Sequence, residues 1–128
     1  MKTSTLSKSE IEVMAALWRL GSGTVATVQK DLQDSDPEQR KIAYTTVATH
    51  LTRMVEKGAV RARKEGRSYL YEPTEKRADY QLLRLGDMVR QFFDGRPSSL
   101  ASRFIESNSF SSEELEELRH LIDKKKPK

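Results

Sequence analysis

The chain has 128 residues, which suffices for one compact domain or for a small domain with an attached oligomerisation segment. Hydrophobic residues make up 36% and charged residues 33%, the net charge is +4, and the absence of cysteine excludes disulfides, zinc–thiolate sites and cysteine nucleophiles. No apolar run approaches the roughly 18–20 residues of a membrane-spanning helix and the sequence shows no signal peptide, so we expect a cytoplasmic protein.

The first predicted helix begins at a capping box. Ser7 and Glu10 are three residues apart, so each side chain can bind the backbone amide of the other residue. Apolar residues then recur along one face to about Leu20, where two glycines end the helix. A second, shorter helix follows Thr24, and a proline-containing turn over residues 34–38 ends it.

The third predicted helix spans about Ala43 to Lys57 and has two different faces. The face expected to be buried carries Val47, Leu51, Met54 and Val55. The opposite face carries Thr45, Thr46, Ala48, Thr49, Thr52 and Arg53. Because threonine is a poor helix former, four threonines on one face favour a helix pressed against another surface, where methyl and hydroxyl groups both find partners.

A β-hairpin is predicted next. In the first strand, Val60, Ala62 and Lys64 alternate with Arg61 and Arg63. Glu65 and Gly66 are expected to supply the turn, and residues 68–71 form the returning strand before Pro73. The basic residues of the segment gather on and near the tip of this hairpin. Since a two-stranded hairpin is only marginally stable alone, it must pack against the helices.

Three more helices are predicted after the hairpin. The longest spans residues 74–94 with apolar residues spaced by four and three, a short one follows, and the last begins at a second capping box formed by Ser111 and Glu114. The apolar positions in these helices are too many for so short a segment to bury by itself. We therefore expect two parts: a domain over residues 1–73 and a dimerisation region over residues 74–128.

Three helices followed by a basic hairpin form the pattern of a winged helix-turn-helix, in which the third helix enters the DNA major groove and the hairpin reaches phosphate or the minor groove. Between residues 40 and 69 eight basic residues stand against two acidic ones. Such a segment is typical of a phosphate-contacting surface, and a merely solvated face is the alternative. The predicted fold is mainly α with a small β-hairpin: an N-terminal winged helix-turn-helix domain followed by a C-terminal helical dimerisation region.

Three segments carry a resemblance to one known family. They are residues 6–18, with LSKSEIEVM and LW, residues 44–58, with YTTVAT, LTRM and KG, and residues 99–118, with SL, FI and SSEELEEL. Together they resemble the BlaI/MecI family of penicillinase repressors over nearly the whole chain. The resemblance implies a homodimeric transcriptional repressor bound to a palindromic DNA operator. It also implies a membrane-bound sensor metalloprotease that relieves repression by cleaving the C-terminal part.

The chain departs from that family in two places. In the family members that are inactivated in the antibiotic system, the cleaved bond resembles Asn-Phe. This chain has Arg103 followed by Phe104 at that place. The copper-responsive branch carries a C-terminal cysteine motif, which this chain lacks. We therefore expect that branch to be excluded, and Arg103–Phe104 is the candidate cleavage site.

The candidate sites follow from these patterns and from the resemblance. The residues expected to contact DNA are Lys41, Tyr44, Thr45, Thr46, Thr49, Arg53, Arg63 and Arg67. The threonines are placed for base edges or phosphates, and the arginines for phosphates. The residues expected to join two copies of the chain are Leu100, Phe104, Ile105, Leu115, Leu118, Leu121 and Ile122.

The sequence gives other classes of function less support. His50 and His120 have no ligand partner at helical spacing and are interpreted as structural, and the glutamates that follow Ser111 as capping and solvation, so we expect no metal site and no cofactor. No catalytic triad, phosphate loop or convergent carboxylate pair indicates an enzyme. Two alternatives stay open: a ligand-gated winged-helix regulator, and a winged helix used for protein–protein contact.

Overall fold

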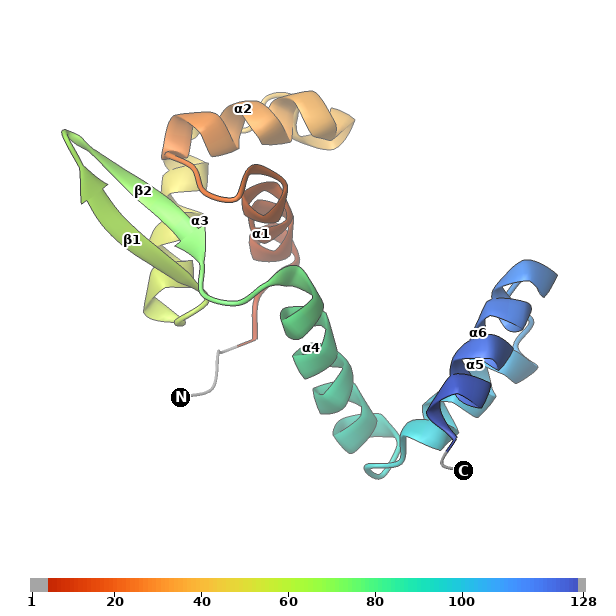
Figure 1. Cartoon of the computed structure of the whole chain (residues 1–128). Helices are drawn as coiled ribbons and strands as arrows, with labels where there is room; N and C mark the ends of the chain where they lie inside the picture. Colours follow the sequence, from red (N-terminus) through yellow and green to blue (C-terminus); the bar gives the residue numbers. More distant parts are fainter. Residues whose placement is uncertain (1–4, 127–128) are drawn as a thin grey trace. The chain divides into compact units, whose positions relative to one another are not determined.

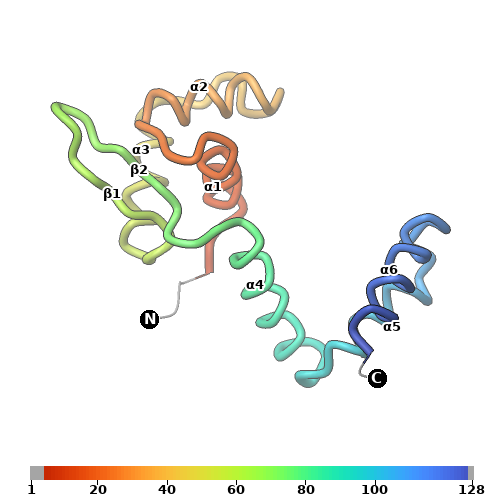
Figure 2. The backbone as a smooth tube through the Cα atoms, in the orientation of Figure 1, coloured from red at the N-terminus to blue at the C-terminus, as the bar shows by residue number. Residues whose placement is uncertain are grey.

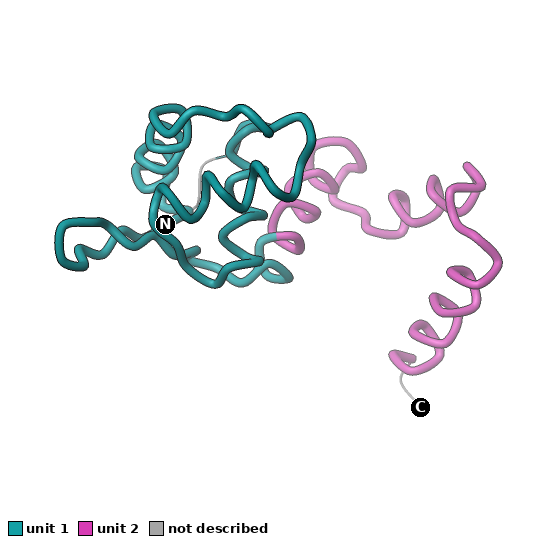
Figure 3. The backbone as a smooth tube through the Cα atoms, turned by 90° about the horizontal axis from the view of Figure 1, so that it is seen from above, with its two compact units in different colours: residues 1–80 teal, residues 81–128 magenta. Residues whose placement is uncertain are grey.

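The computed structural model describes residues 5–126, and the chain divides into two compact units, residues 1–80 and 81–128, coloured teal and magenta in Figure 3. The fold is mainly α with one small antiparallel hairpin, which confirms the predicted fold class. Along the N-terminal unit the elements are α1 (Lys8–Leu20), α2 (Val25–Ser35), the 3-10 helix η1 (Pro37–Gln39), α3 (Tyr44–Glu56), β1 (Val60–Glu65) and β2 (Ser68–Pro73). Among residues 5–126, no helix combines the length and apolarity needed to cross a membrane.

Local sequence signals set the helix starts in the N-terminal unit. Ser7 caps α1 as predicted, because its hydroxyl accepts the Glu10 amide at 3.2 Å and its own amide donates to the Glu10 carboxylate at 2.8 Å. Thr24 and Thr27 form a reciprocal pair of the same kind at the start of α2. Gly21 ends α1 at a φ of +85°, a conformation that costs other residues more than glycine.

Helices α1, α2 and α3 pack against one another and enclose one hydrophobic core (Figure 1, Figure 2). The most completely buried large side chains are Met14, Leu17, Leu51, Met54, Val13, Val28 and Val47. Full burial of such a side chain contributes about 1.5–3 kcal/mol. The predicted inner face of α3 is confirmed, with Val55 half-buried against the same core. The opposite face of α3 is thereby held toward solvent.

The hairpin lies beside α3, against which β1 packs (Figure 1). Glu65 pairs with Ser68, so the two-residue turn is Gly66–Arg67, one residue later than the predicted Glu65–Gly66. Gly66 has a φ of +61° at the first turn position, where a two-residue hairpin of this kind requires glycine. The shift places Arg67 in the turn itself, at the tip of the hairpin.

A backbone bridge ties the hairpin to the start of α2. The amide of Tyr71 donates to the carbonyl of Gly23 at 2.8 Å, and the amide of Gly23 donates back at 2.9 Å. A Cβ on Gly23 would lie 2.7 Å from the Thr27 hydroxyl, so glycine also leaves room for the α2 cap. The position of the hairpin relative to the three helices is therefore fixed by the bridge, by the contact of β1 with α3 and by the contact of β2 with α1.

The long helix after the hairpin, α4 (Arg77–Phe92), begins three residues later than the predicted Thr74. The Thr74 hydroxyl donates to the Gly58 carbonyl at 2.8 Å and its amide donates to the Ala59 carbonyl at 3.0 Å, so Thr74 closes the base of the hairpin. The indole N–H of Trp18 donates to the carbonyl of Glu75 at 3.0 Å. These contacts hold residues 74–75 against the N-terminal unit before the helix can start.

The N-terminal unit extends into the first turn of α4. Tyr80 is 5% exposed, and its ring lies 5.4 Å from that of Trp18 between centroids. The predicted boundary at residue 73 coincides with the end of β2, whereas the contacts of Tyr80 carry the unit to residue 80. An aromatic pair in this tilted geometry adds to the burial energy of both rings.

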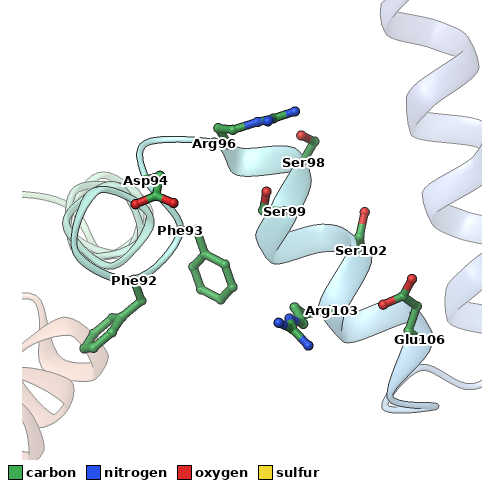
Figure 4. A pocket seen from close by; sticks show the side chains of 9 residues that line it. All are labelled: Phe92, Phe93, Asp94, Arg96, Ser98, Ser99, Ser102, Arg103 and Glu106. Carbon is green, nitrogen blue, oxygen red and sulfur yellow. The ribbon is translucent and has the colours of Figure 1, made fainter.

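The C-terminal unit contains most of α4, α5 (Pro97–Glu106) and α6 (Ser112–Lys125). The predicted capping box at the start of α6 is confirmed, since the Ser111 hydroxyl accepts the Glu114 amide at 3.1 Å. Between the end of α4 and α5 lies a polar hollow of about 440 Å³, lined by three serines and by the side chains that Figure 4 shows. Of the residues in this unit that the structure describes, only Val89 is a buried apolar side chain.

Candidate nucleic-acid interface

The exposed face of α3 presents the side chains that the sequence predicted for DNA contact. Thr45, Thr46, Thr49 and Arg53 are exposed, and Tyr44 is 54% exposed at the start of the helix. Glu56, at the last residue, is the one acidic side chain of α3. Ala48 is half-buried and packs against the core, so its prediction on the exposed face was wrong, because its position borders the buried stripe.

The N-terminus of α3 has no side-chain cap. Its N-cap residue is Ala43, which makes no capping hydrogen bond, whereas α1, α2 and α6 each begin at a capping box. An uncapped helix start leaves backbone N–H groups and a partial positive charge available to an anion. Lys41 is exposed three residues before the helix begins. The start of α3 is therefore suited to a phosphate group of DNA.

Two glutamines of α2 hold the turn that precedes α3. The amide nitrogen of Gln29 donates to the Ile42 carbonyl at 3.0 Å, and that of Gln33 donates to the same oxygen at 3.4 Å. A third glutamine, Gln39, donates to the Glu12 carboxylate at 2.7 Å. These contacts were not predicted from the sequence, since a half-buried glutamine carries no local signal of its distant partner.

Two threonine hydroxyls on α3 are bound to the helix itself. The Thr49 hydroxyl donates to the Thr45 carbonyl at 2.9 Å, and the Thr52 hydroxyl donates to the Ala48 carbonyl at 3.0 Å. Both side chains are nevertheless exposed. Their hydrogen-bonding capacity toward a ligand is consequently restricted to accepting, since a hydroxyl has a single hydrogen to donate.

The hairpin carries arginines at and near its tip. Arg67 lies in the turn and is exposed, while Arg63 is exposed and pairs with Glu65 at 3.2 Å. Arg61 pairs with Glu72 across the strands at 3.5 Å. Ion pairs this exposed are worth little, so Arg63 can exchange Glu65 for a phosphate at small cost.

Two tyrosines, Tyr69 and Tyr71, lie on the returning strand of the hairpin. The rings of Tyr69 and Tyr71 lie 6.5 Å apart between centroids on β2. Burial raises the pKa of the Tyr71 hydroxyl, and the neighbouring Tyr69 and Tyr44 raise it further. The raised pKa keeps the Tyr71 hydroxyl protonated, as a hydrogen-bond donor, near neutral pH.

A buried ion pair joins α1 to the end of α3. Glu10 is 2% exposed, and its carboxylate accepts a hydrogen bond from the Lys57 ammonium at 2.6 Å. Burial opposes ionisation of Glu10, but the hydrogen bonds from Lys57 and Ser7 outweigh it, so the pKa of this carboxyl lies below its ordinary value. Lys57, one of the basic residues of the segment, is therefore paired with Glu10 and only partly exposed, rather than available to an anion.

The residues predicted for dimerisation lie on α5 and α6 with much of their surface uncovered in a single chain. Phe104 and Ile105 are each 47% exposed, and Leu121 and Ile122 exceed half exposure. Leu115 is 40% exposed, whereas Leu100 and Leu118 are half-buried. Further apolar side chains on α4 are exposed as well: Leu82, Leu85, Met88 and Phe92. These faces lack a cover within the part of the unit that the structure describes.

The candidate cleavage site lies inside a helix. Arg103 and Phe104 both belong to α5, and the Arg103 carbonyl accepts the amide of Ser107 at 3.0 Å. The Phe104 ring packs against that of Phe110 at 5.8 Å between centroids. Both residues of this peptide bond are thus exposed, but its carbonyl is held in a backbone hydrogen bond of the helix.

The histidines and acidic residues form no cluster of metal-ligand type within residues 5–126. His50 is half-buried on α3, and His120 is an exposed residue of α6 that lies 4.0 Å from the Glu116 carboxylate. Glu114 closes the cap of α6, as predicted. The chemistry that remains at the exposed α3 face is hydrogen bonding, methyl contact and positive charge.

Three packed helices, the third exposed along one side, and a basic antiparallel hairpin beside it define a winged helix-turn-helix protein. The chain belongs to the penicillinase repressor family, which it matches over residues 6–124. It is 30% identical to the penicillinase repressor of Bacillus licheniformis, over 98% of this chain and 94% of that protein.

Two further relatives agree with this assignment. The chain is 27% identical to the methicillin resistance regulatory protein MecI of Mammaliicoccus sciuri, over 97% of this chain and 98% of that protein. The solution structure of the DNA-binding domain of the repressor BlaI matches 62% of this chain and 92% of its own length, with a TM-score of 0.51 and 33% identity. The similarity therefore covers the winged helix in structure and nearly the whole chain in sequence.

Proposed function

We propose that this protein is a transcriptional repressor that binds a palindromic DNA operator as a homodimer. The observation that carries the proposal is the α3 surface: an exposed face with a single acidic residue at its far end, an uncapped N-terminus, and arginines on the adjacent hairpin. The names of the relatives, a penicillinase repressor and a methicillin resistance regulatory protein, support the same function.

The groups at this surface divide by the part of DNA that they can reach. Thr45, Thr46 and Thr49 face outward in the first turns of α3, where a recognition helix meets base edges. Lys41, Arg53, Arg63 and Arg67 supply positive charge around them and suit phosphates. Tyr44 lies at the uncapped helix start and suits a phosphate or sugar contact.

The homodimer is supported by the exposed apolar faces of α4, α5 and α6. Most of the large apolar side chains that are exposed among the described residues lie on these three helices, and a second copy of the chain offers the same faces for pairing. Two recognition helices in such a dimer would address half-sites about 34 Å apart, one turn of DNA. The residues proposed for this interface remain those predicted from sequence on α5 and α6.

The experiment that tests the DNA contact is the salt dependence of binding. In the Arg63→Ala, Arg67→Ala double variant, the slope of log affinity against log salt should become shallower by about 0.9 for every phosphate contact removed. The Arg119→Ala variant, which removes an exposed charge from α6, should keep the wild-type slope. An unchanged slope in the double variant would show that the hairpin does not touch the DNA backbone.

We also propose that repression is relieved by a membrane-bound sensor metalloprotease that cuts between Arg103 and Phe104. The cut would detach α6 and its apolar residues from the dimer, so that the two half-sites would no longer be bound as one unit. Arg103 requires a protease pocket that accepts a long cation. Mass spectrometry of the protein from induced cells should show a fragment ending at Arg103, and intact protein released from DNA would contradict cleavage as the switch.

A further inference from the structure

The hydroxyls of Thr49 and Thr52 have a fixed role within α3. Each donates its hydrogen to the carbonyl four residues earlier, at 2.9 and 3.0 Å, and neither can donate to a base without losing that bond. Because Oγ1 is turned to the helix backbone, the Cγ2 methyl is the side-chain atom left to face outward from these exposed residues. The outward surface at both positions therefore combines a methyl group with an oxygen that can only accept.

Base pairs differ in how well they match such a surface. An A·T pair presents the thymine methyl and the adenine amino donor in the major groove, and so offers a partner to both groups. Guanine presents two acceptors, which need a donor that these hydroxyls do not supply. The cytosine amino group can also donate to the accepting oxygen, so it is the threonine methyl that favours A·T, while guanine is disfavoured because its acceptors are left without a partner.

The two threonines are spaced for neighbouring base pairs. They are three residues apart on α3, which places them about 4.5 Å apart along the helix axis. Successive base pairs of DNA are about 3.4 Å apart. One α3 helix can therefore bring its two methyl groups to adjacent steps of the same half-site.

We propose that Thr49 and Thr52 determine specificity by contacting thymine methyl groups, so that the operator half-site contains A·T pairs opposite these residues. The proposal rests on the proposed function, since it requires α3 to lie in the major groove. Such a contact differs from other DNA contacts because it requires the methyl group of thymine, which deoxyuridine lacks.

The test begins with the full-length protein and a library of random duplex DNA, from which bound sequences are enriched. The enriched duplex is then resynthesised with deoxyuridine in place of thymidine at one position at a time. The wild-type protein should lose affinity by about fourfold for each methyl that it contacts, at one or two positions of each half-site. Deoxyuridine at the remaining positions serves as the control.

Matched variants assign the effect to the protein side. Thr49→Ser keeps the hydroxyl and removes the methyl, so it should bind the thymidine and deoxyuridine forms of one position equally. Thr49→Val removes the hydroxyl and keeps the methyl, so it should retain the preference for thymidine. Thr52→Ser and Thr52→Val should behave in the same way at the neighbouring position, and circular dichroism of each variant checks that α3 has folded.

The outcomes distinguish failure of DNA binding from failure of the methyl contact. If no sequence is enriched from the library, the proposed function is overturned and this inference with it. If a sequence is bound specifically but deoxyuridine costs nothing at any position, the inference alone is overturned. A serine variant that keeps the thymidine preference, or a folded valine variant that loses it, would equally overturn the role of the threonine methyl.

Discussion

The Glu10 carboxylate has two partners: it completes the cap of α1 and forms an ion pair with Lys57 at the far end of α3. A carboxylate that is 2% exposed would ordinarily be costly to ionise, yet its pKa is lowered by these hydrogen bonds. The ionised form is therefore the form that the fold stabilises. The position of α3 relative to α1 depends on a charge as well as on packing.

Removing the positive partner should destabilise the protein in a pH-dependent way. In Lys57→Met, Glu10 is left buried without its cation, and the free energy of unfolding should fall by about 1–3 kcal/mol at pH 7. Since the folded-state pKa of Glu10 is lowered, the stabilisation is present above its ordinary value of 4.5 and is lost as pH falls through the lowered value. Urea unfolding of both proteins at pH 7 and pH 3 measures this difference.

A surface pair provides the control for that measurement. Lys30 and Asp34 form an exposed ion pair at 3.1 Å on α2, and Lys30→Met should change the free energy of unfolding by less than about 1 kcal/mol. If the loss in Lys57→Met were the same at pH 3 as at pH 7, packing of the lysine chain rather than the charge of Glu10 would be responsible.

At the scale of single elements, α3 is placed by residues that do not belong to it. Gln29 and Gln33 on α2 both bind the Ile42 carbonyl in the turn before the helix. Gln29→Ala removes the shorter of the two bonds, and the free energy of unfolding should fall by about 1 kcal/mol. Specific DNA binding should weaken more than random binding, because the orientation of α3 is altered while the charges are not.

Fluorescence anisotropy with an enriched duplex and with a random duplex measures that difference. Gln91→Ala, an exposed glutamine near the end of α4, is a matched control that should leave both affinities unchanged. An equal loss for both duplexes in Gln29→Ala would indicate that the turn contributes to stability alone.

Helix α5 determines how readily the candidate cleavage site can be cut. The Arg103 carbonyl is bonded to the Ser107 amide, so a protease must first unwind the last turn. Glycine is about 1 kcal/mol less favourable in a helix than alanine, so Ser102→Gly should be cut by trypsin after Arg103 about fivefold faster than Ser102→Ala. Mass spectrometry of the 1–103 fragment over time measures both rates, and equal rates would show that unwinding does not limit the cut.

The elements that sequence predicted well are those whose signals are local. The capping boxes at Ser7 and Ser111 involve partners three residues away, and the inner stripe of α3 follows from helical spacing alone. The start of α4 was predicted three residues early because the Thr74 hydroxyl bonds to Gly58, sixteen residues away. No local pattern encodes that bond.

At the candidate interface, too, the sequence predicted the position of a residue on a helix better than its contacts. Periodicity predicted which threonines of α3 are exposed, but it could not show that Thr49 and Thr52 turn their hydroxyls to the helix backbone, since a threonine in a helix can adopt either of two χ1 rotamers. The withdrawal of Lys57 from the basic surface depends on Glu10, which is 47 residues away. Charge counted along a sequence therefore overstates the charge that a surface presents.

On the scale of the whole molecule, the N-terminal unit has a core and depends on residues beyond the hairpin. A fragment ending at residue 73 lacks the Glu75 carbonyl that binds Trp18 and the Tyr80 ring that packs on it. It should unfold at lower urea than a fragment ending at residue 80, with a free energy of unfolding smaller by about 2–3 kcal/mol. Trp18, the single tryptophan of the chain, reports unfolding by fluorescence.

Light scattering on the same two fragments tests where the dimer interface lies. Both should be monomers, because the apolar faces proposed for pairing belong to residues 81–128. A dimer formed by the fragment ending at residue 80 would place the interface within the winged helix, and equal stability of the two fragments would show that Tyr80 is dispensable.

The described part of the C-terminal unit has almost no buried apolar side chains, so its folding should depend on the concentration of the protein. If the helices of this unit obtain their core from a second chain, their folded fraction obeys mass action, and the melting temperature rises with protein concentration. Operator occupancy then depends on the square of the monomer concentration while dimers are scarce. A cell that halves its supply of this protein would lose close to three quarters of its dimers, so repression would lapse over a narrow range of expression.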